Sequence, residues 1–391
     1  ASLRAAGRAC DSLVLPAEPR PKPLVETTIA IAERVADAIP IAVGSGVISD
    51  LVKRAARIAG TPYVAVATAA SMDGYAASGA ALQDGAFKRT LPCDPPVAIV
   101  ADLDVVAAAP APMAAWGYGD LAGKVVAGAD WLVADALGEE ALAPAFPMVQ
   151  DPLAGWLARP EAIAARDPQA LGGLLQGLLV TGFAMQAHGS SRPASGSDHQ
   201  FSHLWEMEGL AVGGVPVAHG ACVGIGCIAM LALYEWLLRQ DLSALDVERA
   251  AARRPDLAAA QAEVAAAFAD SAIADSARAE VAAKHPTAGA LRARLKRLAA
   301  QWPALRARLA TQLVAPATMQ ARLAAAGAPS EPGAIGVGLA TLARDYRRAR
   351  LIRRRYTVLD LLADIGRLDE AIDALFAPGG FWGGRTLAGA A

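Results

Sequence analysis

The sequence predicts a two-domain protein, in which an α/β N-terminal domain with a Rossmann-like nucleotide-binding fold precedes an all-helical domain. Strand patterns alternate with helical patterns as far as about residue 107, which indicates a parallel sheet with helical crossovers. Beyond that point the chain is rich in Ala and Leu and has the punctuation of helices. The segment AAAPAPM between them is typical of a linker. We therefore predict domains at 1–110 and 111–391.

The elements of the N-terminal domain follow from their periodicity and their turn residues. The first nine residues indicate the end of an amphipathic helix. The remaining pattern predicts, in order, a short strand at 10–16, a helix at 24–38, a strand at 40–46, a helix at 49–60 and strands at 61–70 and 95–103. A nucleotide-binding fold normally has a strand before its first helix, so we expect the first strand to be missing from the sequence.

Two segments of the helical domain, 171–187 and 221–238, are apolar for almost the length of a membrane span. The first contains Gln176 and Gln186, the second contains Glu235, and neither has the flanks typical of a span. We predict buried helices and no membrane insertion. The Ala-rich segment at 242–310 indicates further helix.

Composition narrows the class of protein. The chain has 391 residues, of which 54% are hydrophobic, so it can build two substantial cores. Lys plus Arg is 36 against 38 for Asp plus Glu, which gives no reason to expect a nucleic-acid partner. The four cysteines form no CxxC pair, which fits a reducing cytoplasm.

Two loops at the carboxyl ends of predicted strands are candidates for nucleotide binding. In VGSGVISD, Gly44 and Gly46 would let backbone N–H groups approach a pyrophosphate at the start of a helix, although such a turn also serves tight packing alone. In TAASMDGYAASGAA, the hydroxyls of Thr68 and Ser71 can donate to a ligand and Asp73 can accept.

Three of the five histidines lie close together in the sequence, in and after SGSDHQFSHLWEMEG. His199 and His203 are four residues apart, so on a helix they share one face, and His219 follows. Paired imidazoles of this kind are offered to metals or to metal-bound substrates, and a site would need an upstream acid as well.

Six motifs in this order resemble the sn-glycerol-1-phosphate dehydrogenase family of the iron-containing alcohol dehydrogenase and dehydroquinate synthase-like superfamily. They are GSGVISDLVKRAA, TAASMDGYAASGA, GYGDLAGK, SRPASGSDHQFSHLWEM, HGACVGIG and RARLIRRRYTVLDLLADIG. The resemblance implies a dehydroquinate synthase-like fold with its active site in the cleft between the two domains. It also implies interconversion of dihydroxyacetone phosphate and sn-glycerol 1-phosphate with NAD or NADP.

The resemblance also implies roles for individual residues. The metal ligands would be Asp120, His199 and His219, holding one divalent ion, with zinc as first choice and nickel or iron as alternatives. Asp120 alone would otherwise be read as a helix N-cap. His203 and Asp73 would be catalytic, contacting substrate together with Asp120 and relaying a proton. The dinucleotide would be held by the stretches Gly46, Val47, Ile48, Ser49, Asp50 and Thr68, Ala69, Ala70, Ser71, besides Gly44.

The chain departs from the family pattern at one place, and its arginines suggest two further roles. Where the family has Thr-Ser after the SMDGY tyrosine, this chain has Ala76 and Ala77, with Ser78 one place later, so a cofactor-contacting hydroxyl is lost or displaced. Arg192 is the local cation that we expect for a substrate phosphate, although it could instead cap a helix end. We expect the arginine cluster of residues 347–355 to form a solvated helix face or an oligomer contact.

We therefore predict a metal-dependent NAD(P)-linked oxidoreductase that acts on a small phosphorylated triose and forms a homo-oligomer. The alternatives are a dehydrogenase of glycerol or another small polyol, and a catalytically impaired homologue that only binds metal and nucleotide.

Overall fold

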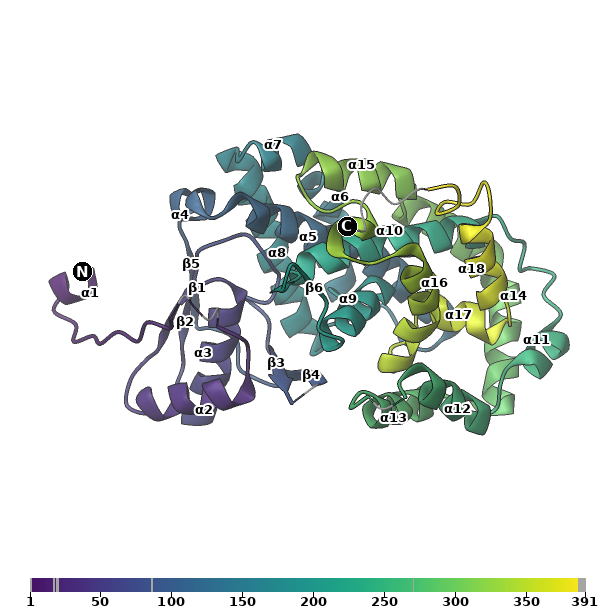
Figure 1. The fold of residues 1–391 in the computed structure, drawn as a ribbon, viewed down its shortest axis with the longest axis horizontal. Coiled ribbons are helices and arrows are strands. Elements are labelled where there is room, and N and C mark those ends of the chain that lie inside the picture. The colour runs from purple at the N-terminus through teal and green to yellow at the C-terminus, as the bar shows by residue number, and fades with distance from the viewer. Residues whose placement is uncertain (1, 17, 19–20, 86, 270, 386–391) are drawn as a thin grey trace.

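The computed structural model describes residues 2–16, 18, 21–85, 87–269 and 271–385. An N-terminal α/β part, purple to blue in Figure 1, lies beside a larger helical body coloured teal to yellow. The long helix that opens the helical body begins at Ala111, the first residue of the second predicted domain. The two-part fold predicted from the sequence is thus confirmed.

The N-terminal part is built on a parallel sheet of three strands in the order β1-β2-β5. Its elements are α1 (Ser2–Ala5), α2 (Val25–Arg34), β1 (Ile41–Gly44), α3 (Gly46–Ala59), β2 (Val64–Ala67), β3 (Ala80–Asp84), β4 (Phe87–Leu91), β5 (Ala98–Ala101) and α4 (Leu103–Ala108). Helix α3 ends at Gly60, whose φ of 69° is the left-handed conformation that a C-cap glycine adopts readily. The carboxyl ends of β1 and β2 place the two predicted nucleotide loops at one edge of the sheet.

The sequence analysis was wrong about one element of this part and missed another. The strand predicted at 10–16 is absent, since these residues belong to no strand. The antiparallel hairpin of β3 and β4 was not predicted, and it extends from the N-terminal part to contact α9 (Ser197–Met207) of the helical body.

The helical body contains one small hairpin of β6 (Ala211–Val212) and β7 (Val215–Pro216). Besides α9, its helices are α5 (Ala111–Leu137), α6 (Ala145–Trp156), α7 (Pro160–Ala164), α8 (Pro168–His188), α10 (His219–Leu238), α11 (Val247–Arg253), α12 (Leu257–Ala267), α13 (Ala274–Lys284), α14 (Ala288–Gln312), α15 (Pro316–Ala325), η1 (Pro332–Ile335), α16 (Leu339–Arg348), η2 (Ala349–Ile352), α17 (Val358–Asp364) and α18 (Leu368–Phe376).

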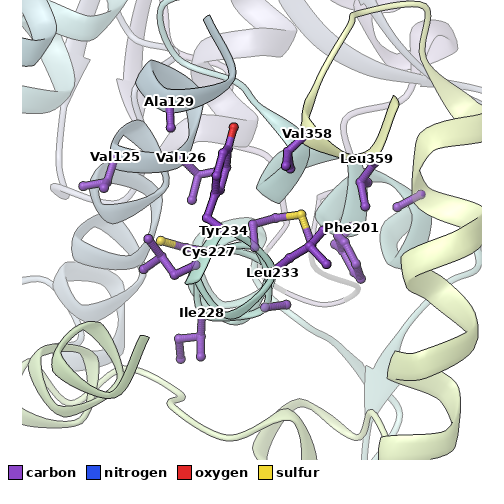
Figure 2. Packing of buried hydrophobic residues seen from close by; sticks show 14 of the residues in the cluster. Val125, Val126, Ala129, Phe201, Cys227, Ile228, Leu233, Tyr234, Val358 and Leu359 are labelled. Carbon is purple, nitrogen blue, oxygen red and sulfur yellow. The ribbon is translucent and has the colours of Figure 1, made fainter. Parts of the chain in front are cut away.

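Helix α10 is the centre of the helical body. Figure 2 looks nearly along it and shows side chains of α5, α9 and α17 around it, including Val126, Phe201 and Val358. By length and composition alone, α8 and α10 could cross a membrane, but 83% of the apolar stretch of α10 is buried inside the protein. The predicted burial therefore holds for α10, which other helices cover, whereas only 56% of the corresponding stretch of α8 is buried.

Helices α5, α9 and α10 approach one another backbone to backbone. A Cβ atom on Gly119 of α5 would lie 2.3 Å from the carbonyl oxygen of Gly220 in α10. A Cβ atom on Gly226 of α10 would lie 2.4 Å from the carbonyl oxygen of Asp198 in α9. Neither position has room for a side chain without movement of a helix.

We predict that Gly119→Ala destabilises the protein by about 1–3 kcal/mol, the usual cost of overpacking a close contact. Denaturant unfolding of the metal-free protein measures the change. The control is Gly289→Ala in α14, where a Cβ would meet nothing within 4 Å. Equal unfolding midpoints for the Gly119 variant and the wild type would contradict the tight contact.

Candidate metal centre and active-site cavity

Three helices bring together one carboxylate and two imidazoles. Asp120 lies inside α5, which begins at Ala111, so it is not the helix N-cap that the sequence alone suggests. His199 lies in the first turn of α9, and His219 is the first residue of α10. The ligand atoms of the three residues all lie within 4.8 Å of one another. One ion can therefore contact all three side chains, although their role as ligands stays a prediction.

Each histidine of this set is oriented by a carboxylate. His199 Nδ1 lies 2.6 Å from Oδ2 of Asp198, and His219 Nδ1 lies 2.5 Å from Oε1 of Glu206. A carboxylate only accepts, so each Nδ1 carries the proton and donates it. The lone pair is then left on Nε2, the arrangement found where histidines bind metals. Neither carboxylate was predicted from the sequence.

Lys124 joins the two acids of the site. Its Nζ donates to Oδ1 of Asp120 at 2.6 Å and lies 2.6 Å from Oδ2 of Asp73. The backbone N–H of Asp73 donates to the other oxygen of Asp120 at 3.1 Å. Asp120 and Lys124 are fully buried, so this contact fixes the SMDGY loop against α5.

Negative charge predominates around the three candidate ligands. Asp73 and Asp120 lie against the ammonium of Lys124. The carboxylates of Asp198 and Glu206 lie against His199 and His219. Burial acts to raise the pKa of Asp120, but Lys124 and His199 hold it below its usual range. Burial acts to lower the pKa of His199, but the neighbouring Asp198 and Asp120 raise it to about 9. The Asp120 shift thus reflects its cationic neighbours, and the His199 shift reflects its carboxylate neighbours.

His203 lies one turn from His199 on α9, as the four-residue spacing predicts. Its ring centroid is 6.0 Å from that of His199 and 5.9 Å from that of His219, with which it stacks. An Nη2 atom of Arg353 lies 3.3 Å from His203 Nδ1. His203 therefore lies beside the candidate metal ligands and faces the same cavity.

That cavity, called the main cavity below, has a volume of about 470 Å³ and lies between the two parts of the protein. Its helical side includes Trp116, His199, His203 and His219. Its N-terminal side includes the predicted cofactor and substrate residues Gly46, Val47, Ile48, Asp50, Ser71 and Asp73. The other predicted cofactor residues do not line the cavity: Gly44, Ser49, Thr68, Ala69 and Ala70.

The loop between Ser71 and Gly79 is held in place by hydrogen bonds from Lys53 of α3. The buried Lys53 ammonium donates to the carbonyl oxygens of Gly74 and Gly79 at 2.6 and 2.9 Å. Ala77 lines the main cavity, whereas Ser78 is exposed to solvent and does not. The displaced hydroxyl thus does not replace the one that the family pattern would place there.

The arginines differ from the sequence predictions. Arg192 is fully buried, and its guanidinium donates to the carbonyl oxygens of Tyr356 and Asp130 and lies near Glu140, so it lines neither this cavity nor its neighbour. The cluster at 347–355 is only in part the solvated face that was predicted, since Arg354 is exposed but other members are buried. Arg348 and Arg350 are more than nine-tenths buried and pair with acids of other helices, and its last three members line a second cavity.

The N-terminal part is similar to a known family, and the fold as a whole is similar to solved structures. Residues 2–110 match the model of the iron-containing alcohol dehydrogenase family. The whole fold is similar to glycerol dehydrogenase from Schizosaccharomyces pombe, with a TM-score of 0.58 and 15% identity over 95% of this chain and 77% of that one. It is also similar to a probable glycerol dehydrogenase from Sinorhizobium meliloti 1021, with a TM-score of 0.53 and 15% identity over 90% of this chain and 83% of the other.

Relatives found by sequence carry a more specific name than the solved structures do. Glycerol-1-phosphate dehydrogenase [NAD(P)+] of Halalkalibacterium halodurans is 39% identical over 50% of this chain and 49% of its own length. The proteins of the same name from Bacillus subtilis and Pyrococcus horikoshii are 38% and 35% identical, over 52% and 50% of this chain and 52% and 55% of their own. The chain thus spans about half the length of these relatives. The predicted resemblance to this dehydrogenase family is confirmed over that part.

Proposed function

We propose that the protein is a metal-dependent, NAD(P)-linked oxidoreductase that interconverts dihydroxyacetone phosphate and sn-glycerol 1-phosphate. One observation carries the proposal: the ligand atoms of Asp120, His199 and His219 lie within 4.8 Å of one another, and the two oriented imidazoles line the cavity between the two parts. The names of the sequence relatives support the substrate. A homo-oligomer and a cytoplasmic setting stay predictions.

The residues present fit a divalent ion. Two histidines with their Nδ1 protons committed to carboxylates and one buried carboxylate are a donor set that zinc accepts, and three protein ligands leave a position for substrate. The carboxylates that lie around the candidate ligands favour a cation over a neutral occupant. A divalent ion there would supply Lewis-acid polarisation of a substrate oxygen.

The N-terminal side of the main cavity would hold the dinucleotide. Gly46 is the first residue of α3, and the first turn of this helix presents N–H groups and the positive end of its dipole to the cavity. NADH or NADPH would supply the hydride. Ala77 offers the cofactor no hydroxyl, but Ser71 and Asp73 of the same loop line the cavity with polar side chains.

His203 would move the proton. Reduction of a ketone requires one proton at the oxygen that becomes the hydroxyl, and His203 lies a helical turn from His199 on the same wall. Asp73 lines the main cavity and its carboxylate is bound to Lys124, so it can accept from the other hydroxyl of the substrate.

The test of the proposed activity is a comparison of substrates. Full-length protein loaded with zinc, nickel or iron is assayed with dihydroxyacetone phosphate and with dihydroxyacetone, and the absorbance of NADH and NADPH is followed. We expect turnover of the phosphorylated ketone at a higher kcat/KM. A preference for dihydroxyacetone would support a small-polyol dehydrogenase, and metal and nucleotide binding without turnover of either would support an impaired homologue.

We predict that His199→Ala loses the metal and nearly all turnover, because a ligand that Asp198 orients is removed. Elemental analysis gives the metal content per chain. His285→Ala is the matched control, since His285 follows α13 and lines neither cavity. A variant at His199 that holds one ion per chain with unchanged affinity would remove this residue from the ligand set.

We predict that His203→Asn keeps the metal and the dinucleotide but lowers kcat by roughly 10²-fold or more, the usual contribution of a positioned acid-base group. Metal analysis and nucleotide titration on the same preparation separate this effect from unfolding. Loss of the metal, or turnover equal to the wild type, would show that the two histidines of α9 have been assigned wrongly.

We predict that Gly46→Val weakens dinucleotide binding by about tenfold or more, because its side chain would overpack the turn. A Cβ at Gly46 would lie 3.0 Å from two atoms of the flexible Met72 side chain. Gly46→Ala should therefore be milder, since Met72 can move away from one methyl group. Titration of nicotinamide fluorescence measures both, and equal dissociation constants for the valine variant and the wild type would reduce the turn to a packing role.

A further inference from the structure

Lys53 carries a buried ammonium to which the proposed function gives no role. It lies two turns into α3, the helix that begins at Gly46, and its side chain is fully buried. Burial lowers the pKa of Lys53, and the carboxylate of Asp50, whose Oδ1 lies 3.6 Å from Nζ, acts in the opposite direction. A charge removed from water costs free energy unless polar groups surround it, so the partners of this ammonium indicate what it does.

Two backbone carbonyl groups of one loop accept hydrogen bonds from this ammonium. Residues 71–79, called the SMDGY loop, contain no helix or strand. Nζ of Lys53 donates to the carbonyl oxygen of Gly74 at 2.6 Å and to that of Gly79 at 2.9 Å. Buried carbonyl groups need a donor, and an ammonium has three N–H bonds to give. One side chain of α3 thus fixes the loop at two points five residues apart.

Asp73, the residue before Gly74, faces the candidate metal centre. Its backbone N–H donates to Oδ2 of Asp120 at 3.1 Å, and its carboxylate lies 2.6 Å from Nζ of Lys124. Asp73 also lines the main cavity. Adjacent residues of the SMDGY loop are therefore held from two sides, by Lys53 of the N-terminal part and by α5 of the helical body.

Met72, the residue before Asp73, packs between the SMDGY loop and the start of α3. A Cβ atom on Gly46 would lie 3.0 Å from Cε of Met72, and a Cβ atom on Gly74 would lie 2.8 Å from its Sδ. The turn proposed for the dinucleotide and the loop that carries Asp73 thus lie against the same side chain. A shift of the loop would change the distance between these two parts of the cavity wall.

We propose that Lys53 is a positioning residue, whose ammonium holds the SMDGY loop so that Asp73 meets the substrate at a fixed distance from the dinucleotide turn. Lys53 does not line the main cavity, so it acts through Asp73. Holding the groups that contact a substrate in one geometry lowers the barrier to reaction. The contact of Asp73 with substrate rests on the proposed function, whereas the fixing of the loop does not.

The test compares two variants of equal length. Lys53→Met and Lys53→Gln are both one bond shorter than lysine, and only the glutamine keeps N–H donors at its tip. The matched control is Arg57→Gln, one turn later on α3, whose half-exposed side chain pairs with Asp94. Backbone hydrogen–deuterium exchange is followed in peptides of the SMDGY loop and of α14. The kcat/KM for dihydroxyacetone phosphate is measured on the same metal-loaded proteins.

We expect Lys53→Met to speed exchange in the SMDGY loop by about tenfold or more, the usual effect of losing hydrogen bonds to a charged group, with exchange in α14 unchanged. The kcat/KM should fall by about tenfold or more, and Lys53→Gln should recover part of both losses. Arg57→Gln should change neither quantity. If Lys53→Met does not fold, Lys53→Gln decides by the same measurements.

A double-mutant cycle with Asp73→Asn tests whether Lys53 acts through Asp73. The protein that carries both Lys53→Met and Asp73→Asn should have a kcat/KM within about twofold of that of Asp73→Asn alone, because the position of a removed carboxylate no longer matters. Losses that multiply in the double variant would overturn the inference.

Unchanged exchange in the SMDGY loop of both Lys53 variants would also overturn it. So would equal acceleration in the loop and in α14, since that would indicate that Lys53 supports the protein as a whole. Faster exchange confined to the loop, in a protein that turns over neither dihydroxyacetone phosphate nor dihydroxyacetone, would support the fixing of the loop and contradict the proposed function.

Discussion

The close approach of α5, α9 and α10 determines the geometry of the candidate metal centre. These helices meet through backbone atoms, because Gly119 faces the carbonyl group of Gly220 and Gly226 faces that of Asp198. Each candidate ligand is the sequence neighbour of a residue in these contacts: Asp120 follows Gly119, His219 precedes Gly220 and His199 follows Asp198. The spacing of the ligand atoms is therefore set by contacts that contain no flexible side chain, which is the pre-organisation that a metal site requires.

Burying this many carboxylates has a cost that shapes the rest of the site. Each ionised group taken from water loses hydration, and the loss is offset only by partners of opposite charge and by hydrogen bonds. Lys124 serves two acids at once, and the imidazoles of His199 and His219 serve Asp198 and Glu206. A divalent cation would add the remaining positive charge, so metal binding and stability of this region should be coupled.

Much of the fold follows from the sequence because its signals are local. The alternation of strand and helix patterns and the two apolar segments predicted the two-part architecture. The four-residue spacing of His199 and His203 predicted that both side chains lie on one face of a helix. The hairpin of β3 and β4 was missed although Asp84–Gly85 is a known turn signal, because the strands beside it are only half apolar. The link from the histidines to Asp120 spans about eighty residues, so only the family resemblance suggested it before the structure placed it.

The environment of the arginine cluster at 347–355 could not be predicted from the residues next to it in the sequence. Its members were predicted to face solvent because arginines close together in sequence usually do, but their acidic partners Glu208, Glu263 and Glu280 are distant in the chain and are brought to them by folding. The same folding places Arg353 beside His203.

This arrangement has a consequence for selectivity. A ketone with its oxygen at the ligand set would be fixed at one point on the helical body, and the glycine turn of α3 belongs to the other domain. A ketone held at one point only could turn about it. Orientation of the reacting carbon toward the dinucleotide would then depend on a second contact with the substrate, so binding energy away from the reacting carbon would serve catalysis as well as affinity.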